Sequence, residues 1–176
     1  MVATMPSGPD DAAPGTGCGH TATVDVHRYS FRSSWVVPAD PDAVYRALRE
    51  VSDYPQWWPQ VRDAVRVDDG IFDMVVRSAL PYDLRFRSTR SREDPETRVL
   101  EAGMTGDLDG FSRWTVTATA DGATAVFEEE VVARKLLLRR LALVARPGFV
   151  ANHAVMMRAG RVGLRAYVAG RRRGDG

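Results

Sequence analysis

The spacing of turns between Val61 and Arg134 constrains the fold of this chain more than any other feature. Asp69-Gly70 and Asp121-Gly122 are two-residue hairpin signals, because glycine accepts the positive φ of a type I′ turn. The segments between turns alternate apolar and polar residues, the period of a half-buried strand. Because short turns join antiparallel neighbours, the region predicts a meander of six antiparallel strands. Three further reversals are expected, at Leu80-Pro81, Asp94-Pro95-Glu96 and Gly106–Gly110.

One strand and two short helices are expected before this meander. The first strand places its alternate apolar residues on one face: Tyr29, Phe31, Trp35 and Val37. Asp40-Pro41 then supplies an N-cap followed by proline at the first helical position, which predicts a short amphipathic helix. A second short helix is expected over 54–58, where Pro59 ends it.

After Arg134 the apolar period changes from two to between three and four. Residues 135–145 and 149–168 predict helix, with an interruption at Pro147-Gly148. The sheet can bury its covered face only by curling around this C-terminal helix. We therefore expect an α+β fold in which a curved antiparallel sheet of about seven strands wraps a long helix. The helix stripe consists of Phe149, His153, Met156, Met157, Gly160, Leu164 and Val168.

Composition assigns one domain and excludes several classes of protein. A chain of 176 residues with 44% apolar and 27% charged residues is typical of a globular domain. Residues 1–27 are rich in Gly, Pro, Ala and Thr without an apolar period, so a disordered tail is expected there. The folded domain is expected over 28–170, and residues 171–176 are expected to form a basic tail. A net charge of +1 with no basic face argues against nucleic acid as a partner.

The sequence carries no clear metal, disulfide or membrane signal. The single cysteine, Cys18, excludes an internal disulfide and a cysteine-based zinc site, and the three histidines are too scattered for a histidine site. We expect no metal and no cofactor. No stretch approaches the roughly 20 apolar residues that span a bilayer, and no secretory pattern is present. Stable membrane insertion is not expected, the expected location is the cytoplasm, and no signal sets an oligomeric state.

The order of elements and two local motifs resemble the START-like (SRPBCC) superfamily, within it the polyketide cyclase/dehydrase and coenzyme-Q-binding branch. The motifs are the segments Val37–Tyr45 (VPADPDAVY) and Tyr54–Val61 (YPQWWPQV). The resemblance covers 29–169 and implies a helix-grip fold around a deep cavity. It further implies a hydrophobic small-molecule ligand: a lipid, a quinone or an aromatic polyketide. Leu84 and Phe86 stand where cyclase strands often carry tryptophan.

Tryptophans are the first candidates for cavity walls. Trp57 and Trp58 precede Pro59 where the family places one wall of the pocket mouth, and an indole stacks well on a flat ligand. Either ring could instead pack under the sheet. Trp114 alternates inward and is expected to face the cavity or the core. The thioethers of Met156 and Met157 suit either a ligand or an irregular core.

Arg90 and His153 are the candidates for chemistry. Arg90 lies in phase with Leu84 and Phe86, and the resemblance matches it to a cyclase arginine. A guanidinium on the covered face needs a partner, which could be a ligand enolate or carboxylate, or a glutamate in a structural ion pair. His153 could transfer protons near neutral pH, or be a satisfied core residue.

Two charged segments leave alternatives open. Alternation sends Glu128 and Glu130 to the face opposite Phe127 and Val131, so this acidic run is expected to be solvated rather than to supply a general base. Residues 134–146 could be a membrane-surface helix or the first half of the gripped helix.

Three functions follow from these observations. The first is a carrier or non-catalytic binder of a hydrophobic small molecule, which needs only the cavity. The second is a polyketide cyclase or dehydratase that catalyses aldol closure or dehydration, using Arg90, a tryptophan N–H and His153. The third is a protein-interaction module that uses the basic helix.

Overall fold

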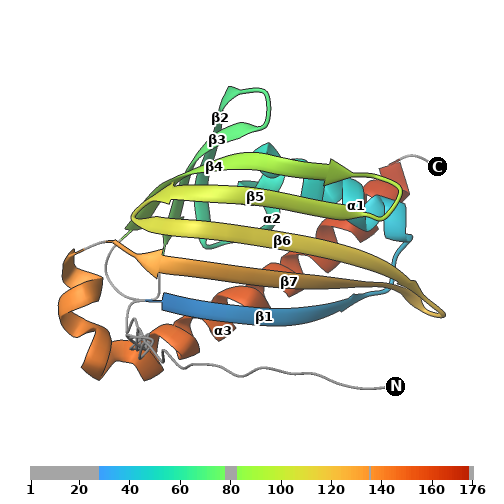
Figure 1. Cartoon of the computed structure of the whole chain (residues 1–176). Helices are drawn as coiled ribbons and strands as arrows, with labels where there is room; N and C mark the ends of the chain where they lie inside the picture. Colours follow the sequence, from blue (N-terminus) through green and yellow to red (C-terminus); the bar gives the residue numbers. More distant parts are fainter. Residues whose placement is uncertain (1–27, 78–82, 135, 175–176) are drawn as a thin grey trace, which may run out of the picture.

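A computed structural model describes residues 28–77, 83–134 and 136–174 (Figure 1). The expected N-terminal tail and the expected turn at Leu80-Pro81 lie outside these residues. A seven-stranded antiparallel sheet runs in the order β1-β7-β6-β5-β4-β3-β2. The strands are β1 Arg28–Val37, β2 Val61–Asp68, β3 Ile71–Arg77, β4 Asp83–Asp94, β5 Val99–Gly106, β6 Leu108–Thr119 and β7 Gly122–Ala133.

The sheet is the predicted meander, closed by the first strand. β2 to β7 pair in chain order, and β1 returns to pair with β7, with Phe31 opposite Glu129. Gly70 has φ +67° in the first hairpin turn, as its Asp-Gly signal requires. The curved sheet, with α3 crossing one face of it in Figure 1, is a helix-grip fold.

The two short helices form as their sequence signals predict. Helix α1 (Pro41–Arg49) is capped by Asp40, whose Oδ1 accepts a hydrogen bond from the Ala43 amide at 3.0 Å. A single 3₁₀ turn, η1 (Val51–Asp53), leads into α2 (Tyr54–Trp57). The buried Tyr54 hydroxyl donates to the Leu48 carbonyl at 2.7 Å and so ties α2 to α1.

The long helix α3 (Leu136–Gly174) differs from expectation in two respects. It passes through Pro147-Gly148 without ending, because a proline removes one helical hydrogen bond and can kink a helix without stopping it. Figure 1 shows the first, orange turns running in a different direction from the remainder. The helix also continues to Gly174, so the basic tail expected from Arg171 is helical over most of its length.

The main core lies where α3 meets the sheet and α2. Trp35, at 2% exposure, is its largest fully buried side chain. Glycines allow α3 to approach this closely: a Cβ at Gly160 would lie 2.6 Å from Trp58 and 2.8 Å from Trp35. A Cβ at Gly163 would overlap the Trp57 carbonyl oxygen. No helix in the described segments is long and apolar enough to cross a membrane.

Candidate ligand-binding cavity

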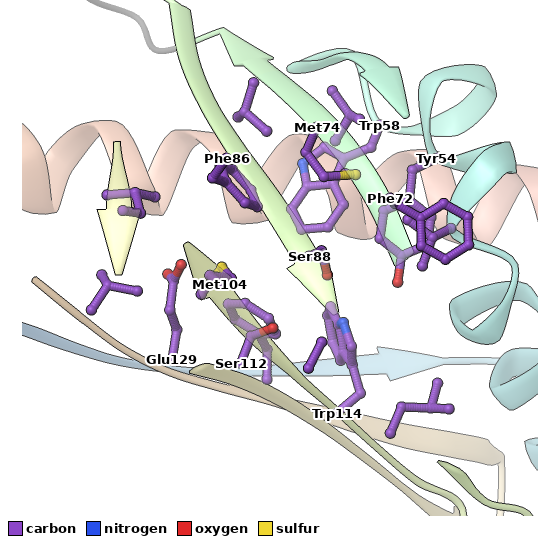
Figure 2. Close-up of a pocket in the computed structure, with 18 of the residues that line it drawn as sticks. Tyr54, Trp58, Phe72, Met74, Phe86, Ser88, Met104, Ser112, Trp114 and Glu129 are labelled. Carbon is purple, nitrogen blue, oxygen red and sulfur yellow. The ribbon is translucent and has the colours of Figure 1, made fainter. Parts of the chain in front are cut away.

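A cavity of about 200 Å³ lies between the inner face of the sheet, α2 and α3. Its volume is many times the roughly 10–15 Å³ that one water requires. Figure 2 shows side chains from β3, β4, β6 and β7 converging on this space. Most of the lining side chains are apolar, among them Phe72, Met74, Phe86, Met104, Val131 and Met157. A space of this kind excludes water in favour of an apolar molecule.

Eight of the nine residues expected to bind a ligand lie on the wall of this cavity. From the strands come Leu84, Phe86, Arg90 and Trp114; from the helices and the residue after α2 come Trp58, His153, Met156 and Met157. Trp114 thus faces both core and cavity, and its ring packs edge-on against Trp35, 4.7 Å between centroids. That these eight residues contact a ligand stays a prediction.

Trp57 does not line the cavity. Its ring is 4% exposed and packs against Tyr54, 4.8 Å between centroids, and against Tyr167 of α3 at 6.4 Å. Its ring also stacks on that of Trp58, with 5.5 Å between centroids and 18° between planes, and of the two tryptophans only Trp58 lines the cavity. Trp57 is therefore a core residue that anchors α2 to α3.

The indole N–H of Trp58 is not free to bind a ligand oxygen. It donates to the Met156 carbonyl at 3.1 Å, so this tryptophan offers the cavity its ring face. The bond also joins the residue after α2 directly to the wall that α3 supplies.

Arg90 forms the structural ion pair that the sequence left as one of two possibilities. Its guanidinium binds the Glu93 carboxylate and donates to the Arg49 carbonyl at 3.2 Å. Both side chains are mostly buried, with 20% and 23% of their surface exposed. Glu93 also binds Arg49, so one carboxylate holds two arginines at the end of β4. Arg90 borders the cavity, but its guanidinium already has two partners within the protein, the Glu93 carboxylate and the Arg49 carbonyl.

Glu129 is the polar cavity residue that sequence reasoning missed. Strand alternation places Glu128 and Glu130 outward, and the same alternation turns Glu129 inward with Phe127 and Val131. The expectation of a wholly solvated acidic run is therefore wrong for its middle member. Figure 2 shows the Glu129 side chain directed into the space beside Ser112, its cross-strand neighbour on β6.

His153 lies opposite this carboxylate on α3. Its Nε2 is 3.4 Å from Glu129 Oε2, and the two side chains are 13% and 12% exposed. The separation suits an ion pair, yet Nε2 makes no hydrogen bond of normal geometry. The imidazole stacks on Phe31, with 3.9 Å between centroids and 10° between planes. A carboxylate and an imidazole thus face each other in apolar surroundings, where a charged group needs a partner.

Tyr54 is held in its neutral form. Burial raises the pKa of its hydroxyl well above the ordinary value, an effect that Arg90 and a hydrogen bond with Trp114 only partly oppose. Its proton is directed at the Leu48 carbonyl. Tyr54 therefore contributes shape, not acidity, to the cavity wall. No group of three potential metal ligands occurs in the segments that the structure describes.

Residues 28–169 match the family described as polyketide cyclase / dehydrase and lipid transport. The chain belongs to this family. No curated protein matches it significantly. Solved structures with the same fold include the Zhui aromatase/cyclase from Streptomyces sp. R1128, with TM-score 0.71 and 18% identity over 85% of this chain and 99% of that one. Protein TTHA0849 from Thermus thermophilus gives TM-score 0.69 and 16% identity over 81% and 98%. A START superfamily protein from Mycobacterium smegmatis gives TM-score 0.61 and 13% identity, over 82% of this chain and 98% of that one. At these identities the likeness concerns the fold.

Proposed function

We propose that this family member binds a hydrophobic small molecule in its internal cavity and acts in the cytoplasm as a carrier or non-catalytic binder. The observation that supports this most directly is the cavity itself, walled by aromatic and thioether side chains. The Arg90 guanidinium already binds Glu93 and the Arg49 carbonyl, so no ligand is needed to satisfy its hydrogen bonds. A lipid, a quinone or an aromatic polyketide fits these walls.

Native mass spectrometry on protein purified from its own host, followed by denaturing extraction, tests this proposal. We expect a discrete extra mass that leaves on unfolding. The matched variants are Ser88→Phe, which fills the cavity, and Thr89→Phe, which adds the same ring to the exposed opposite face of β4. The proposal is supported if the Ser88→Phe protein loses the extra mass and the Thr89→Phe protein keeps it. A clean apo mass, with no uptake of added lipid, quinone or polyketide by the wild-type protein, would contradict it.

A second function, polyketide cyclase or dehydratase, is favoured by the Glu129–His153 pair. In aldol closure, Glu129 would accept the proton from the α-carbon of a ketone. That carbon would then bond to a second carbonyl carbon, whose oxygen would take a proton from His153. In dehydration, Glu129 would accept a proton from the carbon next to the one that bears the hydroxyl group, a double bond would form between these two carbons, and the hydroxyl group would leave as water with a proton from His153. The 3.4 Å separation would let the proton return from Glu129 to His153 between cycles.

Isosteric substitution separates the two functions. Glu129→Gln removes the base and keeps the cavity shape, and Glu128→Gln on the outer face is its matched control. An enzyme should lose at least about 100-fold in turnover of a poly-β-ketone mimic with Glu129→Gln, and keep its turnover with the control. His153→Gln and Arg90→Ala extend the series: Arg90→Ala should abolish turnover in an enzyme that uses this guanidinium, but only weaken the binding of a neutral lipid by a carrier. Unchanged rates in all the cavity variants would exclude these residues from any reaction observed.

A further inference from the structure

The charge of this molecule is distributed very unevenly. Helix α3 contains nine of the 24 basic residues and none of the 23 acidic ones, so it carries nine positive charges. The remainder of the chain, whose other basic residues number fifteen, carries a net charge of −8. The near-zero total therefore combines a positive helix with a negative remainder, and the expectation that the chain has no basic face is wrong for α3. A dipolar distribution of this kind orients a protein near a charged surface.

The outward face of α3 combines these arginines with exposed apolar residues. Val155 and Val162 are 57% and 58% exposed, among the most exposed large apolar side chains described. They alternate along the helix with Arg158 and Arg165, which are also exposed. Ala151, Ala154 and Ala166 complete the stripe at spacings of three and four, opposite the buried Leu164 side.

These arginines are available to an external partner. Neither Arg158 nor Arg165 forms an ion pair with an acidic residue of the described segments, whereas most exposed sheet arginines do, such as Arg77 with Asp83 and Arg87 with Asp73. The helix also begins with the sequence LLLRRLALVAR, in which basic residues interrupt an apolar run. Figure 1 shows these first, orange turns at the left, beyond the ends of β7 and β1.

We propose that α3 docks the protein on an anionic membrane surface through the face formed by Ala151, Ala154, Val155, Arg158, Val162, Arg165 and Ala166. An exposed helix face with arginines among apolar side chains lies in the headgroup region of a bilayer, where each basic residue gains from anionic lipid. The face is convex and has no aromatic anchor, so a flat anionic surface suits it better than a protein groove or a base-reading site.

The same helix supplies one wall of the cavity, so docking through α3 would bring the cavity close to the membrane. Asn152 and Met156 line both the cavity and a second hollow that reaches Val155 and contains Arg62 and Arg77. A membrane held against α3 would therefore lie next to residues that line the cavity. This use of the surface rests on the proposed binding function; the docking itself does not.

Co-sedimentation of the full chain with vesicles tests the docking. We expect binding to equal parts of phosphatidylcholine and phosphatidylglycerol, little binding to phosphatidylcholine alone, and weakening by salt, which screens exposed charges over about 10 Å at 0.1 M. Arg158→Glu with Arg165→Glu should reduce binding by about tenfold or more. The control, Arg28→Glu with Arg85→Glu on the outer face of the sheet, changes net charge equally and should retain most of the binding.

Three outcomes would overturn the docking proposal. Equal loss in both double variants would mean that net charge alone is responsible. Equal binding to both vesicle types would remove the role of anionic lipid, and retention on poly-glutamate without any vesicle binding would assign the face to an acidic protein. Thermal unfolding confirms that each variant folds. Ser88→Phe should still dock, so that loss of ligand binding and loss of docking are separate results.

Discussion

The two ends of the space between the sheet and α3 are built differently. At one end Trp35, Trp58 and Trp114 pack edge to face, and Gly160 brings α3 into contact with the rings. At the other end a smaller cluster forms around Tyr29 and Met104, and its partners Phe31, Leu84, Phe86 and Leu108 are only partly buried. The first end holds the fold together, and the second leaves the cavity open. Core packing is therefore tight at one end of this space and loose at the other, although Trp58 and Trp114 of the packed end also line the cavity.

Removing a ring at each end should show this separation most strongly. Trp35→Ala removes the largest buried side chain of the packed end and should lower the free energy of unfolding by about 3–5 kcal/mol. Phe86→Ala at the open end removes a partly buried ring that already borders a void, so about 1–2 kcal/mol is expected. Denaturant unfolding of both variants measures the difference. Equal losses would mean that the cavity end is as tightly packed as the core.

The glycines of α3 provide a second comparison. Gly163→Ala would place a methyl group on the Trp57 carbonyl, and backbone cannot yield as a side chain can, so we expect a loss of about 2–4 kcal/mol. Gly170→Ala lies on the same helix with no atom within 4 Å and should gain about 0.5–1 kcal/mol. Thermal unfolding of both compares close packing with helix propensity. A neutral Gly163→Ala would show that α3 can move away from α2.

Arginine pairs sharpen the contrast between buried and exposed charge. Arg90→Ala leaves Glu93 mostly buried beside Arg49 alone, and we expect a loss of about 1–3 kcal/mol. Arg87→Ala removes an equally good ion pair with Asp73, but both side chains are about half exposed, and no measurable change is expected. If chemical denaturation gives the same result for both variants, burial at the end of β4 contributes nothing to the Arg90 pair.

Tyr167 should report the integrity of the packed end at high pH. Partial burial and a 2.6 Å hydrogen bond from its hydroxyl to Asp53 raise its pKa to about 12. Because the folded-state pKa lies above the ordinary 10, the stabilisation is present below pH 10 and is lost between pH 10 and 12. Unfolding measured across this range should show a steeper fall for the wild-type protein than for Tyr167→Phe. Tyrosinate absorbance that titrates for Tyr167 at the ordinary pKa would contradict this.

How much of the site the sequence predicts depends on whether a residue's direction follows from a local period. Strand alternation determines the direction of Trp114 and Phe86, and the same alternation is sufficient to place Glu129 inward. Strand alternation cannot show which of Trp57 and Trp58 reaches the cavity. Helix α2 is a single turn, and its orientation is set only when it packs against α3. The pairing of Arg90 with Glu93 is one of two possibilities in the sequence, and only the contact between the side chains distinguishes them.

The sequence alone determined the strands, the capped helix and the antiparallel pairing of consecutive strands from β2 to β7, because these follow from residues that are neighbours in the chain or one hairpin apart, whereas the pairing of β1 with β7 came from the tertiary structure. It also determined the one-sided charge of the last helix. The tertiary structure decided which residues meet across long separations: Glu129 with His153, Trp58 with the Met156 carbonyl, and Gly163 with Trp57. It also decided that Pro147-Gly148 does not end α3. These contacts depend on how far the sheet curls and where the helix lies, and those quantities are set by the packing of the whole core.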